Sequence, residues 1–199
     1  MPGAAAIGLG LSDPQAQSQA IFRGVLDAMS APGRVVTLPD AFDSPEPLMP
    51  ATTAVLLTLA DFHTPVWLDG GAANDAVNGY LRFHCGCPMV AQPTDAAFAV
   101  ISDASAIPDP DQFGLGSDEY PDRSTTVLIQ LDSLGQDAGL RLSGPGIDGA
   151  TDLSVTGLAA DWLGKRQQLA PLFPLGLDLI LISETAVAAL PRSTIIEIQ

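Results

Sequence analysis

The last quarter of the chain limits the possible folds most strongly. Two runs rich in leucine and β-branched residues, 171–183 and 190–198, are separated there by a short connection. A chain end normally frays unless packing holds it, so an apolar end of this composition predicts packed strands. We therefore expect the C-terminus to lie inside a sheet.

The spacing of apolar residues predicts further strands and helices. Runs 97–101 and 125–131 are continuously apolar, as in sheet strands that are covered on both faces. Other strands are predicted at 34–38, 65–68, 140–143 and 153–156, and helices at 51–60, 74–83 and 159–169. The segment 107–123 is interrupted by prolines and glycines, and we expect a mobile loop with one short helical turn.

A first helix is predicted to begin near Asp13. Asp13 can cap this helix, Pro14 fits its first turn, and the sequence APG at 31–33 ends it. The apolar residues Ile21, Phe22, Val25, Leu26 and Met29 are predicted to fall on one face of this helix. The proline-rich and acidic segment 40–50 is expected to be a surface loop.

Length and composition indicate one globular domain. A chain of 199 residues, 47% hydrophobic and 16% charged, can bury a core of ordinary size. No internal repeat or low-complexity boundary divides it. We expect a flexible N-terminal segment, 1–14, followed by a single α/β domain, 15–199.

The charge balance excludes some partners. The chain has 23 acidic and 8 basic residues, for a net charge of -15, and no basic cluster that could bind nucleic acid. No apolar run reaches the roughly 20 residues that cross a bilayer, and no basic residue precedes Arg23, so a signal peptide is not expected. We therefore expect a cytoplasmic protein with no nucleic acid or membrane partner.

Catalytic and metal-binding motifs are scarce. The sequence has no nucleophile elbow, no phosphate-binding loop with its lysine and no His-Glu-x-x-His helix. The segment 144–149 (GPGIDG) formally matches a dinucleotide-binding pattern, but Pro145 lacks an N–H donor and Asp148 would repel a pyrophosphate, so we interpret it as a turn. Cys85 and Cys87 are too few for a disulfide framework or a closed zinc site, and we interpret them as thiols in a tight turn.

The two histidines are His63 and His84. His63 is interpreted as a partly exposed structural residue. Arg82 lies two residues before His84, and a strand-like end of the predicted helix would point both side chains the same way. Together they could hold an oxyanion or a partner's carboxylate, although a structural or interface role is favoured.

Several separated segments resemble, in order, the PhnH family, the H subunit of the bacterial carbon-phosphorus lyase core complex. The resemblance covers about residues 15–198 and rests on the sequences FRGVLDAMSAPG (22–33), ATTAVLLTLAD (51–61), TPVWL (64–68), LRFH (81–84), LRLSGPGI (140–147), FPLGLDLIL (173–181) and LPRST (190–194).

This resemblance implies a subunit that acts beside the G, I and J subunits in phosphonate catabolism. The complex supports formation of a ribose 1-phosphonate 5-triphosphate from a nucleoside triphosphate and an alkylphosphonate. The fold implied is a three-layer α/β/α sandwich with a mixed sheet, similar to pyridoxal-phosphate (PLP)-dependent transferases but without the cofactor site. Lys165, the single lysine, lies in a polar run and is expected to be exposed rather than buried as a Schiff base requires.

Two classes of function remain open from the sequence. The first is a non-catalytic or assembly-supporting subunit, which also forms a homodimer when alone. The second is a free-standing transferase or hydrolase that acts on a small phosphate- or phosphonate-bearing substrate. The candidate ligand or interface residues for either class are Arg82, His84 and Arg192, with no catalytic, metal or cofactor-binding residue assigned.

Overall fold

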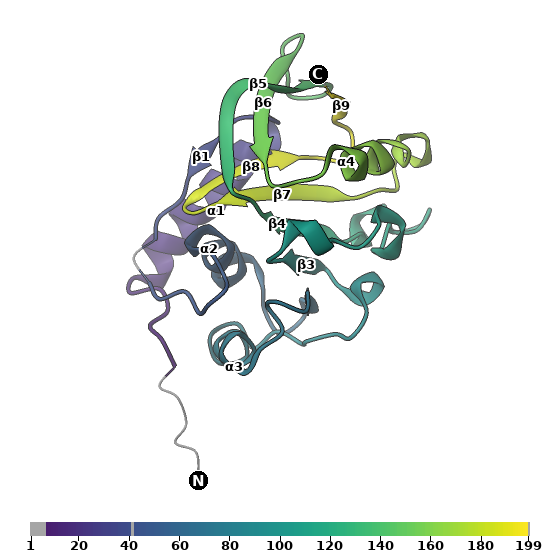
Figure 1. The fold of residues 1–199 in the computed structure, drawn as a ribbon. Helices are drawn as coiled ribbons and strands as arrows, with labels where there is room; N and C mark the ends of the chain where they lie inside the picture. Colours follow the sequence, from purple (N-terminus) through teal and green to yellow (C-terminus); the bar gives the residue numbers. More distant parts are fainter. Residues whose placement is uncertain (1–6, 41, 199) are drawn as a thin grey trace.

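A six-stranded mixed sheet forms the centre of the computed structural model, which describes residues 7–40 and 42–198 (Figure 1). In spatial order its strands are β1 (Val36–Thr37), β8 (Ala186–Leu190), β7 (Asp178–Ser183), β4 (Thr126–Gln130), β3 (Phe98–Ile101) and β2 (Val66–Leu68). Strands β7, β4, β3 and β2 are parallel, whereas β8 and β1 join by antiparallel pairing. The predicted α/β class with a mixed sheet is confirmed.

A second, smaller sheet contains the C-terminal strand. Its order is β6 (Thr151–Thr156), β5 (Ser133–Ser143) and β9 (Ile195–Ile198), and both pairings are antiparallel. The run 190–198 is therefore not one strand, because a turn at 191–194 separates the end of β8 from β9. The C-terminus is held by a sheet as predicted, but β9 is an edge strand of the smaller sheet rather than part of the central one.

Three of the helices begin with a feature that the sequence provides. The four α-helices of the described chain are α1 (Pro14–Ser30), α2 (Pro50–Leu59), α3 (Asp75–His84) and α4 (Ala160–Gln167), and the first three have such a feature. The Asp13 carboxylate accepts the N–H of Ala16 at 3.1 Å, and the Asn74 side chain accepts that of Val77 at 3.0 Å. At the start of α2, proline occupies the first turn. Within 107–123 the structure has two short 3-10 turns, Pro110–Gln112 and Pro121–Arg123, where one was expected.

The strands of the central sheet supply two hydrophobic clusters, one on each face. In β4, Leu128 faces the first cluster, whereas Val127 and Ile129 face the second. The first cluster packs the sheet against α1, α2 and α3, and the second packs it against α4 and the small sheet. Figure 1 shows β5 and β6 on the opposite side of the central sheet from α2 and α3. This double cover explains why the central strands are continuously apolar.

The buried face of α1 differs from the predicted one. Ile21, Val25 and Ala28 are buried, but Phe22 and Leu26 are about half exposed, at 50% and 53%. Each helical residue turns by about 100°, so Phe22 and Leu26 are displaced from the row that starts at Ile21. The apolar face predicted for this helix is therefore only partly buried.

Part of the segment 1–14 contacts the domain. The Leu9 N–H donates to the Asp43 carboxylate at 2.6 Å, and the Asp43 N–H donates to the Leu9 carbonyl at 2.9 Å. Tyr80 also donates its hydroxyl to the Leu9 carbonyl, at 3.1 Å. Residues 1–6 of the segment predicted to be flexible, and residue 41 of the loop 40–50, lie outside the described residues. Among the helices given above, none has the length and apolarity needed to span a bilayer.

Candidate functional site

Arg82 and His84 do not form a joint site. Helix α3 continues through His84, so the expected strand-like end is wrong, and residues two apart on a helix do not face each other. His84 is half-buried, with Nε2 3.0 Å from the Gly8 carbonyl oxygen and its ring 4.4 Å from that of Tyr80. Arg82 is exposed and forms no ion pair or hydrogen bond with any described residue.

Arg192 is occupied by contacts within the protein. Its guanidinium forms an ion pair with Asp178 and a hydrogen bond with the Ser124 hydroxyl. It also donates to the carbonyl oxygens of Pro121 and Pro174, at 2.6 and 3.1 Å. These contacts join the start of β7 to the turns before β4 and β7. Arg192 therefore has a structural role, which Arg82 does not share.

Arg166 is a buried arginine that the sequence analysis missed. Only 4% exposed, it donates to the carbonyl oxygens of Thr194 at 2.9 Å, Pro191 at 2.6 Å and Leu190 at 3.3 Å. Burial lowers the pKa of Arg166 to about 10. The adjacent Lys165 is exposed as predicted, and its ion pair with Asp109 (2.6 Å) raises the pKa of the lysine. The polar sequence 164–168 does not indicate that Arg166 is buried while its neighbour Lys165 is exposed.

The two cysteines are free thiols at the end of α3. Cys87 is buried, and Cys85 is half-buried with its sulfur 3.6 Å from the Leu56 carbonyl oxygen. A hydrogen bond between the thiols, together with burial, raises the pKa of Cys85, and the same bond lowers the pKa of Cys87. Within 7–40 and 42–198, no group of three His, Cys, Asp or Glu side chains is placed to hold a metal ion.

The glycine-rich segment 144–149 forms the connection between β5 and β6. It leads directly into a strand, so its interpretation as a turn is confirmed. Gly146 has a positive φ of 85°, and a Cβ there would lie only 2.3 Å from the Ser30 carbonyl oxygen. Glycine therefore allows this turn to approach the end of α1.

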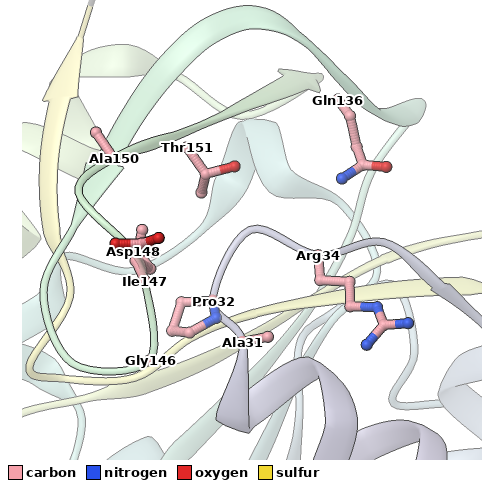
Figure 2. Close-up of a pocket in the computed structure, with 9 residues that line it drawn as sticks. All are labelled: Ala31, Pro32, Arg34, Gln136, Gly146, Ile147, Asp148, Ala150 and Thr151. Atoms are coloured by element: carbon pink, nitrogen blue, oxygen red, sulfur yellow. The ribbon is translucent and has the colours of Figure 1, made fainter.

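This close approach creates a pocket of about 280 Å³ between the end of α1 and the 144–149 turn (Figure 2). The lining residues come from three separate segments and are Ala31, Pro32, Arg34, Gln136, Gly146, Ile147, Asp148, Ala150 and Thr151. We call it the α1–turn pocket. Two of these segments, 31–34 and 146–147, overlap or adjoin sequences on which the family resemblance rests.

Charged groups of both signs line the α1–turn pocket. Figure 2 shows Arg34 and Gln136 on one side, Asp148 on the other, and Pro32 and Thr151 between them. None of the side chains of Arg34, Gln136, Asp148 and Thr151 has a hydrogen bond or ion pair to another described residue. These polar groups are therefore available to a ligand. Sequence reasoning missed Arg34 because the pocket exists only after distant segments meet.

A larger pocket of about 850 Å³ lies between α3 and residues 7–8 and 43–45. Its charged lining residues are Asp43 and Asp75, both acidic. The lining reaches Ile7, where the described part of the chain begins. An anionic substrate is therefore better matched by the α1–turn pocket, which contains an arginine.

Together, the fold and these sites define a mixed α/β protein in which His84 and Arg192 contact the protein's own groups and Arg82 is exposed. The model of the bacterial phosphonate metabolism protein family, PhnH, matches residues 9–197. The chain belongs to the PhnH family.

Two relatives cover nearly the whole chain. The alpha-D-ribose 1-methylphosphonate 5-triphosphate synthase subunit PhnH of Rhizobium meliloti (strain 1021) is 36% identical over 186 residues, which are 94% of this chain and 93% of that protein. A putative C-P lyase subunit protein, HtxG, of Stutzerimonas stutzeri is 34% identical over 185 residues, which are 92% of this chain and 87% of that protein.

Proposed function

We propose that this protein is a subunit of a bacterial carbon-phosphorus lyase assembly that acts in phosphonate catabolism. The observation that carries the proposal is the family match over residues 9–197, together with a relative named as a ribose 1-methylphosphonate 5-triphosphate synthase subunit. The role is to support formation of ribose 1-phosphonate 5-triphosphate from a nucleoside triphosphate and an alkylphosphonate.

The finer parts of this proposal concern partners and location. The partners are the G, I and J subunits, the isolated chain forms a homodimer, and the assembly is cytoplasmic. Arg82 is a candidate contact with a partner subunit, because its guanidinium is exposed and unpaired among the described residues. His84 and Arg192 bind the protein's own backbone and side chains, which makes them weaker candidates for an external ligand.

The proposed fold relationship also goes beyond the α/β class. We propose that the central sheet and its covering layers correspond to the three-layer α/β/α sandwich of PLP-dependent transferases, without the cofactor. The parallel order β7-β4-β3-β2 supports this proposal. The exposed position of Lys165 supports the absence of a Schiff base, because a Schiff-base lysine requires a desolvated site.

The subunit role is favoured over a free-standing transferase or hydrolase. That alternative requires Arg82, His84 and Arg192 to act on one anion, but Arg192 is bound to Asp178 and the other two point apart on α3. Catalysis of phosphoryl or glycosyl transfer needs positioned charge at the reacting group. A non-catalytic role is consistent with this arrangement.

Co-expression with tagged G, I and J subunits tests the proposal. We expect the chain to co-purify with all three, and the isolated chain to release no adenine from a nucleoside triphosphate in the presence of methylphosphonate. Light scattering of the isolated chain should give the mass of a dimer. A complex of the other three that excludes this chain, or full synthase activity of the chain alone, would contradict the subunit role.

A further inference from the structure

We propose that the α1–turn pocket binds a small zwitterionic phosphonate, with the phosphonate group on Arg34 and an ammonium group on Asp148. This inference rests on the proposed function for its substrate class and assigns a binding site within this subunit. It names aminoalkylphosphonates as the ligand class that the pocket fits best.

The case for an anionic group begins with Arg34. Among the described residues, Arg141 and Arg192 form ion pairs with Asp152 and Asp178, and the other arginines, including Arg34, form none. Arg34 differs from the other unpaired arginines because it lines the α1–turn pocket, where its guanidinium has no partner in the described chain. A guanidinium binds the planar edge of a phosphonate or phosphate with two parallel hydrogen bonds. The Gln136 amide, on the same side of the pocket in Figure 2, can add a further donor.

The opposite end of the pocket is suited to a cation. The Asp148 carboxylate lies there, separated from Arg34 across the pocket in Figure 2, and it too has no partner in the described chain. Ala31, the residue after the last turn of α1, also lines the pocket. The carbonyl end of a helix carries partial negative charge, which favours an ammonium and disfavours a second anion.

Size and charge separate this ligand from a nucleotide. A volume of about 280 Å³ lies at the lower end of the range for small-molecule sites and suits a ligand of fewer than about ten non-hydrogen atoms. A nucleoside triphosphate is larger and carries several negative charges, which one arginine cannot balance beside Asp148. The ammonium group of an aminoalkylphosphonate offsets one of the one to two negative charges of its phosphonate, so this ligand brings less net negative charge than a nucleoside triphosphate and is repelled less by Asp148.

A ¹H–¹⁵N NMR titration with 2-aminoethylphosphonate, methylphosphonate and inorganic phosphate tests the proposal. We expect resonances of residues 31–34 and 146–151 to shift, with a dissociation constant for 2-aminoethylphosphonate on the order of 1 mM, since the groups are exposed to solvent. This ligand should bind at least about fivefold more tightly than either methylphosphonate or phosphate, because only it satisfies both charged ends. Equal binding of the three, or shifts that map elsewhere, would overturn the assignment.

Two variants separate the two ends of the site. Arg34→Gln should weaken 2-aminoethylphosphonate binding by about tenfold or more, whereas Arg23→Gln, an exposed arginine of α1 outside the pocket, should leave it unchanged. Asp148→Asn should reduce 2-aminoethylphosphonate binding to the methylphosphonate level and leave methylphosphonate within about twofold of its original affinity. Wild-type affinity in Arg34→Gln, or an equal loss in Arg23→Gln, would contradict the role of Arg34.

Co-purification of the variants with the partner subunits tests the subunit role independently of ligand binding. Arg34→Gln and Asp148→Asn should still assemble with the partner subunits and keep the circular dichroism spectrum of the wild type. Failure of the wild-type chain to assemble would reject the proposed function without changing the titration. Failure of the titration in a chain that assembles normally would reject the ligand site alone.

Discussion

Arg166 stabilises the C-terminal region through hydrogen bonds from a single side chain. Its guanidinium satisfies carbonyl oxygens at 190, 191 and 194, where the chain leaves the central sheet for the small one. Arg166→Met removes these donors and leaves buried carbonyl groups unpaired, although it also removes the cost of burying a charge. We expect the free energy of unfolding to fall by roughly 2–4 kcal/mol, measured by urea denaturation.

The adjacent residue provides a matched control for this prediction. Lys165→Met removes an exposed ion pair and should change the free energy of unfolding by less than about 1 kcal/mol. A similar change in both variants would contradict the structural role of Arg166.

Burial lowers the pKa of Arg166 to about 10 in the folded protein, below its ordinary value. Above that pH the unfolded chain therefore binds the guanidinium proton more tightly than the folded chain does. The contribution of Arg166 to stability therefore rises from about pH 10 towards the ordinary arginine pKa.

At the residue scale, the sequence indicates which polar side chains could bind a ligand but not which of them lie close together in the fold. Arg82, His84 and Arg192 all lie in segments that resemble the family, but the structure places them in separate surroundings. The burial of Arg166 and the opening around Arg34 depend on contacts between distant segments. The polar sequence around Arg166 (164–168) and the sequence APGR that ends at Arg34 (31–34) do not indicate these long-range contacts.

Most elements were predictable because local signals determine them. The cap Asp13, the apolar spacing of 74–83 and the apolar runs of β3, β4 and β7 predict the right elements at nearly the right positions. Strand β8 was missed because its sequence, AVAAL, is rich in alanine and becomes a strand through pairing with β7. The sheet that β9 joins was also not predictable, since strand partners are chosen by long-range packing.

Helix α2 depends on a side chain from another element. Gln130 of β4 is 4% exposed, and its carbonyl oxygen accepts from the Met49 N–H at 2.6 Å and from the Thr52 hydroxyl at 2.7 Å. Its amide donates to the Pro47 carbonyl oxygen at 3.0 Å. Gln130 therefore performs the capping that α2 lacks from its own N-cap residue, Met49.

Gln130→Met tests this link between α2 and the sheet. The substitution keeps the approximate volume but leaves buried polar partners unsatisfied, so we expect the free energy of unfolding to fall by roughly 2–3 kcal/mol. Chemical denaturation measures this change. Gln112→Met, at an exposed position of a 3-10 turn, is the control and should lie within about 0.5 kcal/mol of the wild type. A loss below 1 kcal/mol in Gln130→Met would show that α2 does not need this cap.

The whole molecule is expected to unfold as one unit, because β2, β3, β4, β7 and β8 each contribute side chains to both hydrophobic clusters. In β7, Ile180 and Ile182 belong to the cluster under α1, α2 and α3, whereas Leu179 and Leu181 belong to the cluster under α4 and the small sheet. Because both clusters pack on the same sheet, unfolding of the sheet would expose the apolar side chains of both clusters to water. This arrangement supports the proposed single domain, 15–199.

Two probes report on opposite faces and can test this cooperativity. Trp67 and Trp162 both pack in the cluster beside α4, so tryptophan fluorescence follows that face. Most of the helix signal in far-ultraviolet circular dichroism comes from α1, α2 and α3 on the other face. We expect the two urea transitions to have the same midpoint, as two-state unfolding requires. Arg166→Met, on the α4 side, should shift both midpoints equally, whereas a shift confined to fluorescence would show that the two faces unfold separately.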